Sequence, residues 1–342
     1  MTDWRLDWPW PAGEPSGTAR LKVCPEDFRV TEWLDMDGPT VDVGGQGVAS
    51  VPGQGEHLLL YIEKTGDNTP WVAHQLGELS GCGDRGVGYS GLKDRHAVTR
   101  QWFSVQRPGL AADDAGFIDE VRRHWPVLAA ARRASKLRRG EHRGNHFEIR
   151  LREMTGERAE LEHRLNTLTL EGCPNYVGRQ RFGHDGGNLD RAVASASRPV
   201  RRRRGRKGSG NRDGIYFSAA RSWLFNEVLA ERVVRGDWQR PLAGEPDEEP
   251  TGPLWGDGGT TATAEQGTLE REVVARFPTM AGVFADTRMT PERRALVLKP
   301  SGLTWALSAA GADQCLELSF ALEPGQYATT LLSSVVKLDE SF

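Results

Sequence analysis

Apolar and polar residues alternate in short runs towards both ends of the chain, as they do in strands that bury one face. In residues 146–153, for example, Phe147, Ile149 and Leu151 fall on one side and polar side chains fall on the other. Similar runs, several of them bounded by glycine or proline, predict strands over residues 27–34, 57–64, 87–92, 101–106 and 316–322.

Between these runs, apolar residues recur every three to four positions, which is the spacing of the buried side of a helix. The clearest helix is expected at 70–80, where Thr69 fits the N-cap, Pro70 the first helical position and Gly81 the end. We expect further helices over residues 113–124, 157–170, 218–235, 263–277 and 327–338.

Strands at both ends and a helix-rich middle favour an α+β fold in which a sheet domain is interrupted by an inserted domain. We place the first part of the sheet domain at residues 1–170, the helix-rich α+β insertion at 171–304 and the second part at 305–342. The glycine-rich residues 37–55 and the acidic residues 241–259 are expected to be surface loops.

The length and composition exclude several classes of protein. The 342 residues fit about two domains, and 38% hydrophobic with 27% charged residues is ordinary for a globular chain. No apolar run approaches the ~20 residues that span a bilayer, and the first ten residues do not resemble a secretory signal. The four cysteines show neither a C-x-x-C pair nor zinc-ligand spacing. We therefore expect a cytoplasmic protein with reduced thiols.

The net charge of −3 conceals an uneven distribution of cations. Residues 132–143 hold six Lys or Arg and one acid, and residues 198–212 hold eight Lys or Arg and no acid. Such runs suit a polyanionic partner bound to one face, but a solvated basic loop without a partner explains them equally well.

Motifs for phosphate binding, dinucleotide binding and serine hydrolysis are missing, and two other segments attract attention. Asp94 lies between Lys93 and Arg95, whose charges favour an ionised carboxylate, although an ordinary turn aspartate has the same surroundings. Residues 174–183 interleave aromatic residues with Arg and Gln, which could stack bases and hold phosphates or simply pack at a domain junction.

These two segments carry a resemblance to a known family. Residues 91–99 (GLKDRHAVT) resemble the catalytic motif of the TruD family of tRNA pseudouridine synthases. The family's second signature is similar to residues 174–176 (PNY) and 180–183 (QRFG). Shorter matches follow the family order and extend the resemblance over essentially the whole chain: residues 25–28 (PEDF), 144–147 (GNHF) and 325–329 (GQYAT).

The resemblance implies both a fold and a reaction. The sheet would be mixed but mainly antiparallel, of the pseudouridine-synthase type. A uridine in tRNA, at position 13 in bacterial members, would be isomerised to pseudouridine after the base is flipped out of the folded RNA. The reaction consumes no water, electron carrier or metal, so we expect no cofactor and no metal. We further expect tRNA as the partner, no membrane and a monomer.

The resemblance also assigns roles to particular residues. Asp94 matches the catalytic aspartate, which could attack C1′ of the ribose or remove the C2′ proton to give a glycal. Lys22 matches a lysine that would pair with Asp94 and keep it charged, although by itself it reads as a surface lysine before a strand.

Four further residues are candidate contacts of the substrate. Phe147 matches the position expected to stack on the flipped base, and Phe28 matches another substrate contact, but the strand pattern places both rings in the core as well. Asn145 offers an amide to the uracil edge, or is a turn asparagine beside a glycine. Tyr327 stands where the family has phenylalanine, so it either packs or also hydrogen-bonds.

Two other functions remain open at this point. The chain could be an RNA-binding module without chemistry, against which the intact motif around Asp94 argues. It could be a nucleobase hydrolase that uses Asp94, against which the lack of a second carboxylate motif argues weakly. We expect the basic residues 201–207 to bind tRNA phosphates, and His96 and His184 to be structural.

Overall fold

The computed structural model describes residues 3–36, 40–42, 50–196, 210–308 and 314–339. The chain forms two compact units, each of which combines segments that are far apart in the sequence. The sheet unit contains Gly17–Arg158, Pro300–Gly325 and Leu338–Phe342. The helical unit contains Met1–Ser16, Ala159–Lys299 and Gln326–Lys337. Most of the predicted insertion at 171–304 falls in the helical unit, and the predicted domain boundaries remain a prediction.

The sheet unit is built on one large sheet, in which the described strands pair antiparallel except β2 with β6. This mixed, mainly antiparallel sheet confirms the predicted α+β fold class. The strands lie in the order β13 (Ser301–Leu307), β14 (Leu316–Leu322), β8 (Gly144–Leu151), β2 (Phe28–Trp33), β6 (Val98–Gln106), β4 (His57–Lys64), β7 (Val127–Arg133) and β3 (Val41–Asp42), and β5 (Val87–Tyr89) also pairs with β6.

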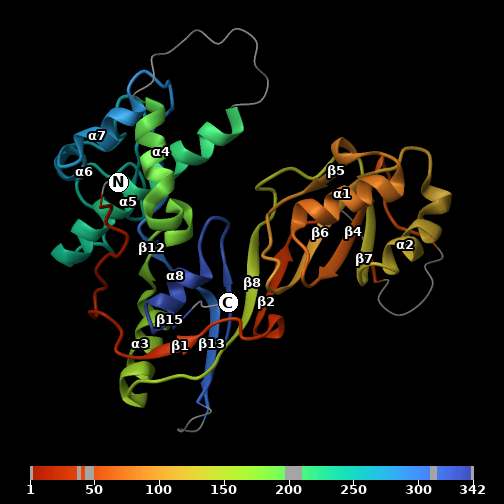
Figure 1. Ribbon diagram of the computed structural model, residues 1–342, viewed down its shortest axis with the longest axis horizontal. Coiled ribbons are helices and arrows are strands. Elements are labelled where there is room, and N and C mark those ends of the chain that lie inside the picture. Colours follow the sequence, from red (N-terminus) through yellow and green to blue (C-terminus); the bar gives the residue numbers. More distant parts are fainter. Residues whose placement is uncertain (1–2, 37–39, 43–49, 197–209, 309–313, 340–342) are drawn as a thin grey trace. The chain divides into compact units, whose positions relative to one another are not determined.

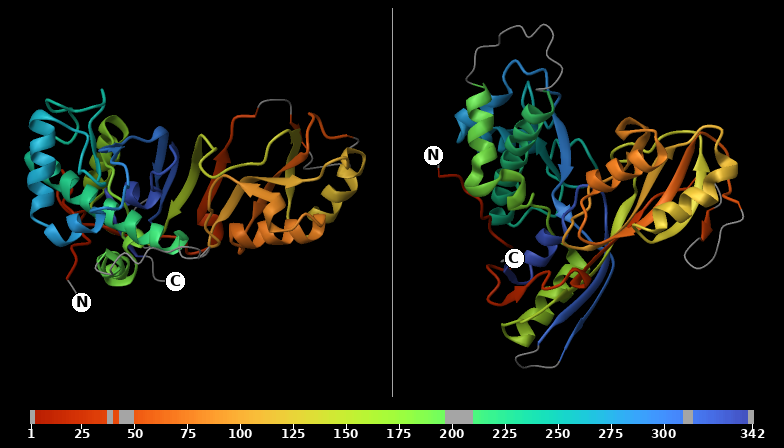
Figure 2. Two further views of the ribbon diagram at one scale, coloured as in Figure 1. Left: turned by 90° about the horizontal axis from the view of Figure 1, so that it is seen from above. Right: turned by 45° about the vertical axis from the view of Figure 1, so that its right-hand side comes forward.

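Two helices, α1 (Thr69–Ser80) and α2 (Asp114–Arg122), cover one face of this sheet, as Figures 1 and 2 show. Alternate residues of β4, among them Leu58, Leu60 and Ile62, pack against them and are fully buried. Strand pairing places Phe28, Glu32, Asn145 and Phe147 on this same face, beyond the end of the helical cover.

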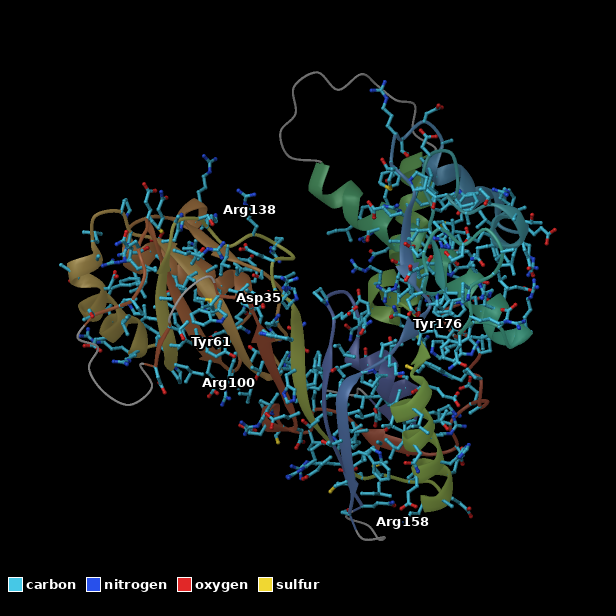
Figure 3. The ribbon with its side chains drawn as sticks, turned by 180° about the vertical axis from the view of Figure 1, so that it is seen from behind. Asp35, Tyr61, Arg100, Arg138, Arg158 and Tyr176 are labelled. Atoms are coloured by element: carbon cyan, nitrogen blue, oxygen red, sulfur yellow. The ribbon has the colours of Figure 1, made fainter. Side chains whose placement is uncertain are left out.

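The opposite face of the sheet carries aromatic and charged side chains. Tyr61 stacks on Trp102 with ring centroids 4.9 Å apart, and Arg100 donates a hydrogen bond of 2.7 Å from Nε to Glu63. Figure 3 labels Tyr61 and Arg100 on this part of the molecule. None of the predicted site residues on β2 and β8 points to this face.

The helical unit is organised around α5 (Gly210–Arg235), whose residues Trp223, Phe225 and Val228 are almost fully buried. An N-terminal aromatic arm joins the same core, since Trp8 packs in it and donates from Nε1 to Glu227 at 2.8 Å. The other elements are α3 (Arg158–Glu171), α4 (Gly187–Ala196), α6 (Ala264–Ala275), α7 (Pro278–Ala281), α8 (Ala328–Ser333) and the strand pairs β10 (Thr251–Leu254) with β11 (Glu292–Ala295) and β9 (Cys173–Pro174) with β12 (Val297–Leu298).

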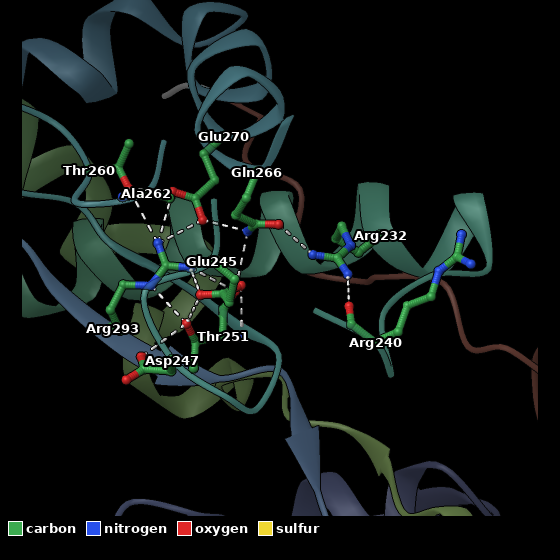
Figure 4. A network of polar contacts seen from close by, with 10 residues as sticks. All are labelled: Arg232, Arg240, Glu245, Asp247, Thr251, Thr260, Ala262, Gln266, Glu270 and Arg293. Atoms are coloured by element: carbon green, nitrogen blue, oxygen red, sulfur yellow. Dashed lines mark hydrogen bonds and ion pairs between the residues drawn. The ribbon is translucent and has the colours of Figure 1, made fainter. Parts of the chain in front are cut away.

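A network of buried charges fixes part of the helical unit (Figure 4). The guanidinium of Arg293 donates to Glu245 at 2.7 Å and to Glu270 at 2.8 Å, and both carboxylates are buried. Gln266 links Glu270 to Arg232 through hydrogen bonds of 2.6 Å on either side. Each charge is therefore paired, which is the condition under which charges are tolerated in a core.

Most predicted elements are confirmed within a few residues, and the exceptions have physical reasons. The helix expected at 218–235 begins earlier, at Gly210, because polar residues can form the first turns of a long helix. The helix expected at 327–338 ends at Ser333, and β15 (Lys337–Asp339) follows and pairs with β1 (Thr18–Arg20). The expected surface loop at 241–259 contains β10 and the buried Glu245, whose charge is neutralised by Arg293.

None of the helices in the described part of the chain has the length and apolarity that crossing a membrane requires. All four cysteines are free, and Cys173 is buried.

Candidate functional site

Asp94 lies in the loop between β5 and β6, and hydrogen bonds from several directions hold this loop in place. The backbone N–H of His96 donates to Asp94 Oδ1 at 2.9 Å, and the N–H of Gly66 donates to the carbonyl of Arg95 at 2.9 Å. The N–H of Lys93 donates to the hydroxyl of Thr69, the first residue of α1, at 2.9 Å. The carboxylate therefore projects from a fixed loop rather than from an ordinary turn.

Lys22 and Asp94 form an ion pair, as the family resemblance predicts. The Lys22 side chain is 8% exposed, so it is not the surface lysine that its sequence context alone suggests. Its φ of +58° is rare for a residue with a side chain. Strained backbone of this kind persists where the surroundings hold it, and here it directs the ammonium to Asp94.

The surroundings of Asp94 favour its charged form. Burial raises the pKa of the Asp94 carboxyl, but hydrogen bonds from Lys22 and the His96 backbone, with the charge of Lys22, outweigh burial and lower it below its ordinary value. The side chain is still 39% exposed, so a substrate can reach an ionised carboxylate.

Aromatic rings lie directly beside this ion pair. The Lys22 Nζ is 4.5 Å from the centroid of the Phe28 ring, and Phe28 meets Phe147 edge to face with centroids 6.0 Å apart. Phe147 also stacks on Phe320 at 5.4 Å. Phe28 and Phe147 are only 6% and 8% exposed, so the core packing predicted from the strand pattern is confirmed. Their contact with a base stays a prediction.

The motif residues next to Phe28 are structural. Asp27 is buried, and Arg152 donates to both of its carboxylate oxygens at 2.7 to 2.9 Å. This bidentate pair fixes the short 3-10 helix Pro25–Asp27 against β8 at the point where β2 begins.

Asn145 belongs to a polar cluster on the same face of the sheet. It lies on β8 opposite Glu32 of β2, and its Oδ1 accepts a hydrogen bond of 2.7 Å from Lys93 Nζ. The same ammonium is 2.8 Å from Glu32 Oε2. Asn145 is therefore not a free turn residue. Its side chain is held by Lys93, the residue that directly precedes Asp94 in the sequence.

Sequence reasoning missed Glu32 and Lys64 at this site. It named Thr69 only as an N-cap and Lys93 only as a charge beside Asp94, whereas Lys93 Nζ contacts Glu32 and Asn145. Lys64 is buried at the end of β4, and its Nζ donates to the carbonyl of Asp67 at 2.7 Å. Burial lowers the pKa of Lys64 to about 8, although the charges of Asp67 and Asp94 oppose this effect. A charged residue at the end of an otherwise apolar strand was the signal that could have revealed it.

Tyr327 lies in the helical unit, where it precedes α8. Its hydroxyl accepts a hydrogen bond of 2.8 Å from Arg181 Nη2, so this position does more than pack. The contact of Tyr327 with substrate stays a prediction.

The second signature is mainly structural. Tyr176 and Phe182 are buried in the core of the helical unit and are unavailable to stack on bases, which favours the packing interpretation of residues 174–183. Asn175 is also buried, and its side chain donates to the carbonyl of Ala295 at 2.8 Å and accepts from Arg294 at 2.7 Å.

The two basic runs differ in what the structure can say of them. In residues 132–143, Arg132 is buried and pairs with Asp114 at 2.6 Å, so it is part of the core. Arg138 and Arg139 of the same run are exposed, and the adjacent Gly140 donates from its N–H to the carbonyl of Ser90 at 2.9 Å, next to the Asp94 loop. The run at 198–212, including the predicted contacts at 201–207, lies almost wholly outside the described residues.

Comparison with known proteins gives one consistent result. A family model described as tRNA pseudouridine synthase D (TruD) matches residues 12–191. Two curated relatives, both named tRNA pseudouridine synthase D, are 52% identical (Marinobacter nauticus) and 40% identical (Cellvibrio japonicus). Each alignment covers 99% of this chain, and 97% and 95% of the respective relative.

The fold has a counterpart among solved structures. A crystal structure from Methanosarcina mazei, described as a tRNA pseudouridine synthase D, superposes with a TM-score of 0.66 at 16% identity. The superposition covers 98% of this chain and 95% of that one, so both units have counterparts there.

Proposed function

This chain belongs to the TruD family of tRNA pseudouridine synthases, which isomerise uridine to pseudouridine, and we propose that its substrate is the uridine at position 13 of tRNA and that Asp94 is the catalytic group. The observation that carries the assignment of Asp94 is its pairing with Lys22 beside the rings of Phe28 and Phe147. An ionised, accessible carboxylate next to an aromatic surface suits attack on a nucleotide whose base is held in place.

The reaction needs one carboxylate in its charged form. The bond from C1′ to N1 breaks, the uracil turns, and C5 bonds to C1′ while C5 loses a proton and N1 gains one. Asp94 either attacks C1′ and is displaced by C5, or removes the C2′ proton to give a glycal. Both routes start from the ionised carboxylate, and Lys22 favours that form in the free protein.

The neighbouring residues would hold the base that is flipped out of the tRNA. We propose that the uracil lies beside the rings of Phe147 and Phe28, and that Asn145 hydrogen-bonds to it. Tyr327 would contact the RNA from the helical unit, together with the basic residues 201–207. The exposed Arg138 and Arg139, adjacent in space to the Asp94 loop, support binding of phosphates close to the reacting nucleotide.

The wider setting follows from the same proposal. An isomerisation without oxidation or hydrolysis needs neither metal nor cofactor, and free cysteines suit a reducing cytoplasm. We propose a cytoplasmic enzyme that acts on tRNA as a monomer. Residues 171–304 would be an insertion into a catalytic domain formed by 1–170 and 305–342.

The test is pseudouridine mapping in a tRNA transcript after incubation with the protein or with Asp94→Asn. Wild type should modify position 13, and Asp94→Asn should lose at least about 10³-fold in rate because the nucleophile or base is gone. The matched control is Asp84→Asn in the same unit, which removes an exposed carboxylate paired with His74 and should leave the rate unchanged.

Each alternative outcome has a definite meaning. Product from Asp94→Asn would overturn the catalytic assignment, and modification only at other uridines would overturn the position. Release of free uracil would identify a hydrolase. Tight RNA binding without any product would identify a binding module.

A further inference from the structure

Three side chains on the Asp94 face of the sheet form a chain of contacts that the reaction chemistry does not require. Lys93 Nζ lies 2.8 Å from Glu32 Oε2 and donates to Asn145 Oδ1 at 2.7 Å. The side chains of Lys93 and Glu32 are 5% and 0% exposed, so the ammonium is enclosed with its counter-ion. Burying an ion pair costs desolvation free energy. Such pairs can nevertheless be retained because they hold nearby groups in one specific conformation.

The backbone of Gly91 passes close to this ammonium. A Cβ added to Gly91 would lie 2.8 Å from Lys93 Nζ and 3.4 Å from Glu32 Oε2, closer to the ammonium than a real side chain comes. The backbone of Lys93 is held separately by the hydroxyl of Thr69. The backbone of Lys93 is thus held by Thr69, and its ammonium lies between Glu32 and Asn145.

The donor chemistry of lysine decides how the Asn145 amide is turned. An ammonium has three donors and no acceptor, so the amide atom that faces Lys93 must be the oxygen. The opposite orientation would place two donors against each other. The Nδ2 group is thus turned away from Lys93, and it makes no hydrogen bond to another residue that the structure describes.

We propose that Lys93 is a positioning residue that sets base specificity: held by Glu32, it locks the Asn145 amide with its N–H donors towards the base, so that the site accepts uracil and rejects cytosine. The inference rests on the proposed function, in which Asn145 contacts the flipped base. Lys93 itself acts only through Asn145.

The chemistry of the two bases explains the selection. Uracil has a carbonyl oxygen at C4, which accepts from the Asn145 amide, whereas cytosine has an amino group there and would oppose donor to donor. During the reaction the ring turns about the axis through N3 and C6, so that C5 replaces N1 and O2 takes the place of O4. A locked donor therefore meets a carbonyl oxygen before and after the turn.

The experiment measures binding in the Asp94→Asn background, where no turnover occurs. Two tRNA transcripts that differ only in U or C at the target position are titrated against the protein, and the ratio of the two Kd values is the readout. With Lys93 present the ratio should favour U by about tenfold, the effect of one satisfied against one opposed hydrogen bond. Lys93→Met should bring the ratio close to one, since the amide can then turn over.

A double substitution separates positioning from direct contact. In an Asn145→Ala background, Lys93→Met should no longer change the ratio. A persistent change there, or an unchanged ratio in the single variant, would overturn the proposal. Lys136→Met removes an equal charge elsewhere in the sheet unit and should weaken both RNAs equally, which leaves the ratio intact.

Glu32→Gln gives a second measurement should Lys93→Met fold poorly. It leaves the ammonium without its counter-ion but keeps the size of the side chain, so the preference for U should fall by a smaller factor, and an unchanged ratio would contradict the inference. Pseudouridine formation by the unsubstituted chain is measured on the same RNA. Loss of all product contradicts the proposed function, whereas normal product with an unaltered ratio contradicts only the role of Lys93.

Discussion

The ion pair between Lys22 and Asp94 shows how one residue controls the state of another. Burial works against a charged Asp94, and the lowered pKa exists only because Lys22 and the His96 backbone donate to it. This arrangement requires a left-handed, strained backbone conformation at Lys22.

Replacing Lys22 by Met should move the acid limb of the activity profile to higher pH. With the pKa of Asp94 lowered, the carboxylate is ionised throughout the neutral range and the rate declines only at acid pH. Without the Lys22 ammonium, less opposes the effect of burial and the pKa of Asp94 rises. The rate therefore begins to fall at a pH nearer neutrality. Single-turnover rates of pseudouridine formation between pH 4 and 8, which span the ordinary range of a carboxyl group, measure the shift.

Lys22→Arg is the matched control for this prediction, because it keeps the charge and the donors although it changes their geometry. Its acid limb should stay near that of the wild type. If Lys22→Met had the same limb as the wild type and only a lower plateau, Lys22 would contact the substrate rather than tune Asp94.

At the residue scale, the sequence identifies the residues of a motif but not the distant residues that they contact in the fold. Asp94 and Lys22 were predicted because the family resemblance links them across 72 positions. Lys93 stands inside the same motif, yet its partners Glu32 and Asn145 come from two other strands. Their meeting depends on the pairing of β2 with β8, two strands that are far apart in the sequence, and a local motif does not specify such a pairing.

Among the elements, the start of α1 joins helix stability to the site. The N-cap is Asn68, which accepts from the N–H of Trp71 at 2.9 Å, and not Thr69 as the sequence predicts. Thr69 is the first helical residue, and its hydroxyl donates to Gln101 at 2.8 Å and accepts from Lys93. Asn68 thus caps the helix, whereas the adjacent Thr69 holds the backbone of the Asp94 loop.

Substitutions at these two positions should therefore separate stability from activity. Asn68→Ala removes the cap and should lower the free energy of unfolding by about 1 kcal/mol with little change in activity per folded molecule. Thr69→Val keeps the cap but frees the Lys93 backbone, and should lower kcat by about tenfold. Urea denaturation measures the free energy of unfolding, and steady-state rates on the same preparations measure kcat. Equal activity in the two variants would contradict the separate roles of Asn68 and Thr69.

The elements with strong periodicity were predictable, and those decided by distant partners were not. The predicted limits of β4 coincide with His57–Lys64, since its apolar run has sharp ends. Strand β10 was missed because its residues lie in an acidic, proline-rich stretch, in which Glu245 is paired with Arg293, 48 positions away. The basic run at 132–143 was taken as one surface, although Arg132 is half of a buried pair.

On the scale of the whole molecule, both units contain buried ion pairs. In the network around Arg293, one buried cation is shared by two buried carboxylates. Glu245 and Glu270 share that guanidinium, and neither carboxylate has access to water in its place. Removal of the shared cation would leave two uncompensated charges in the helical unit.

Arg293→Met should consequently destabilise the protein by about 3–5 kcal/mol. Arg276→Met is the control: it breaks an ion pair between the exposed Arg276 and the partly exposed Glu231, and should cost less than about 1 kcal/mol. Urea denaturation followed by tryptophan fluorescence compares them. Similar costs for both variants would show that the network is not needed to hold this region together.

The way the chain divides between its units constrains how it can be made. The aromatic arm around Trp8 packs with residues of α5 that are translated more than 200 positions later. Strand β8 (Gly144–Leu151) likewise pairs with β14 (Leu316–Leu322), which is translated much later. At about 5–20 residues per second, these apolar surfaces stay uncovered for many seconds during synthesis. Cotranslational protection by a chaperone should thus matter more for this chain than for one whose domains are completed in order.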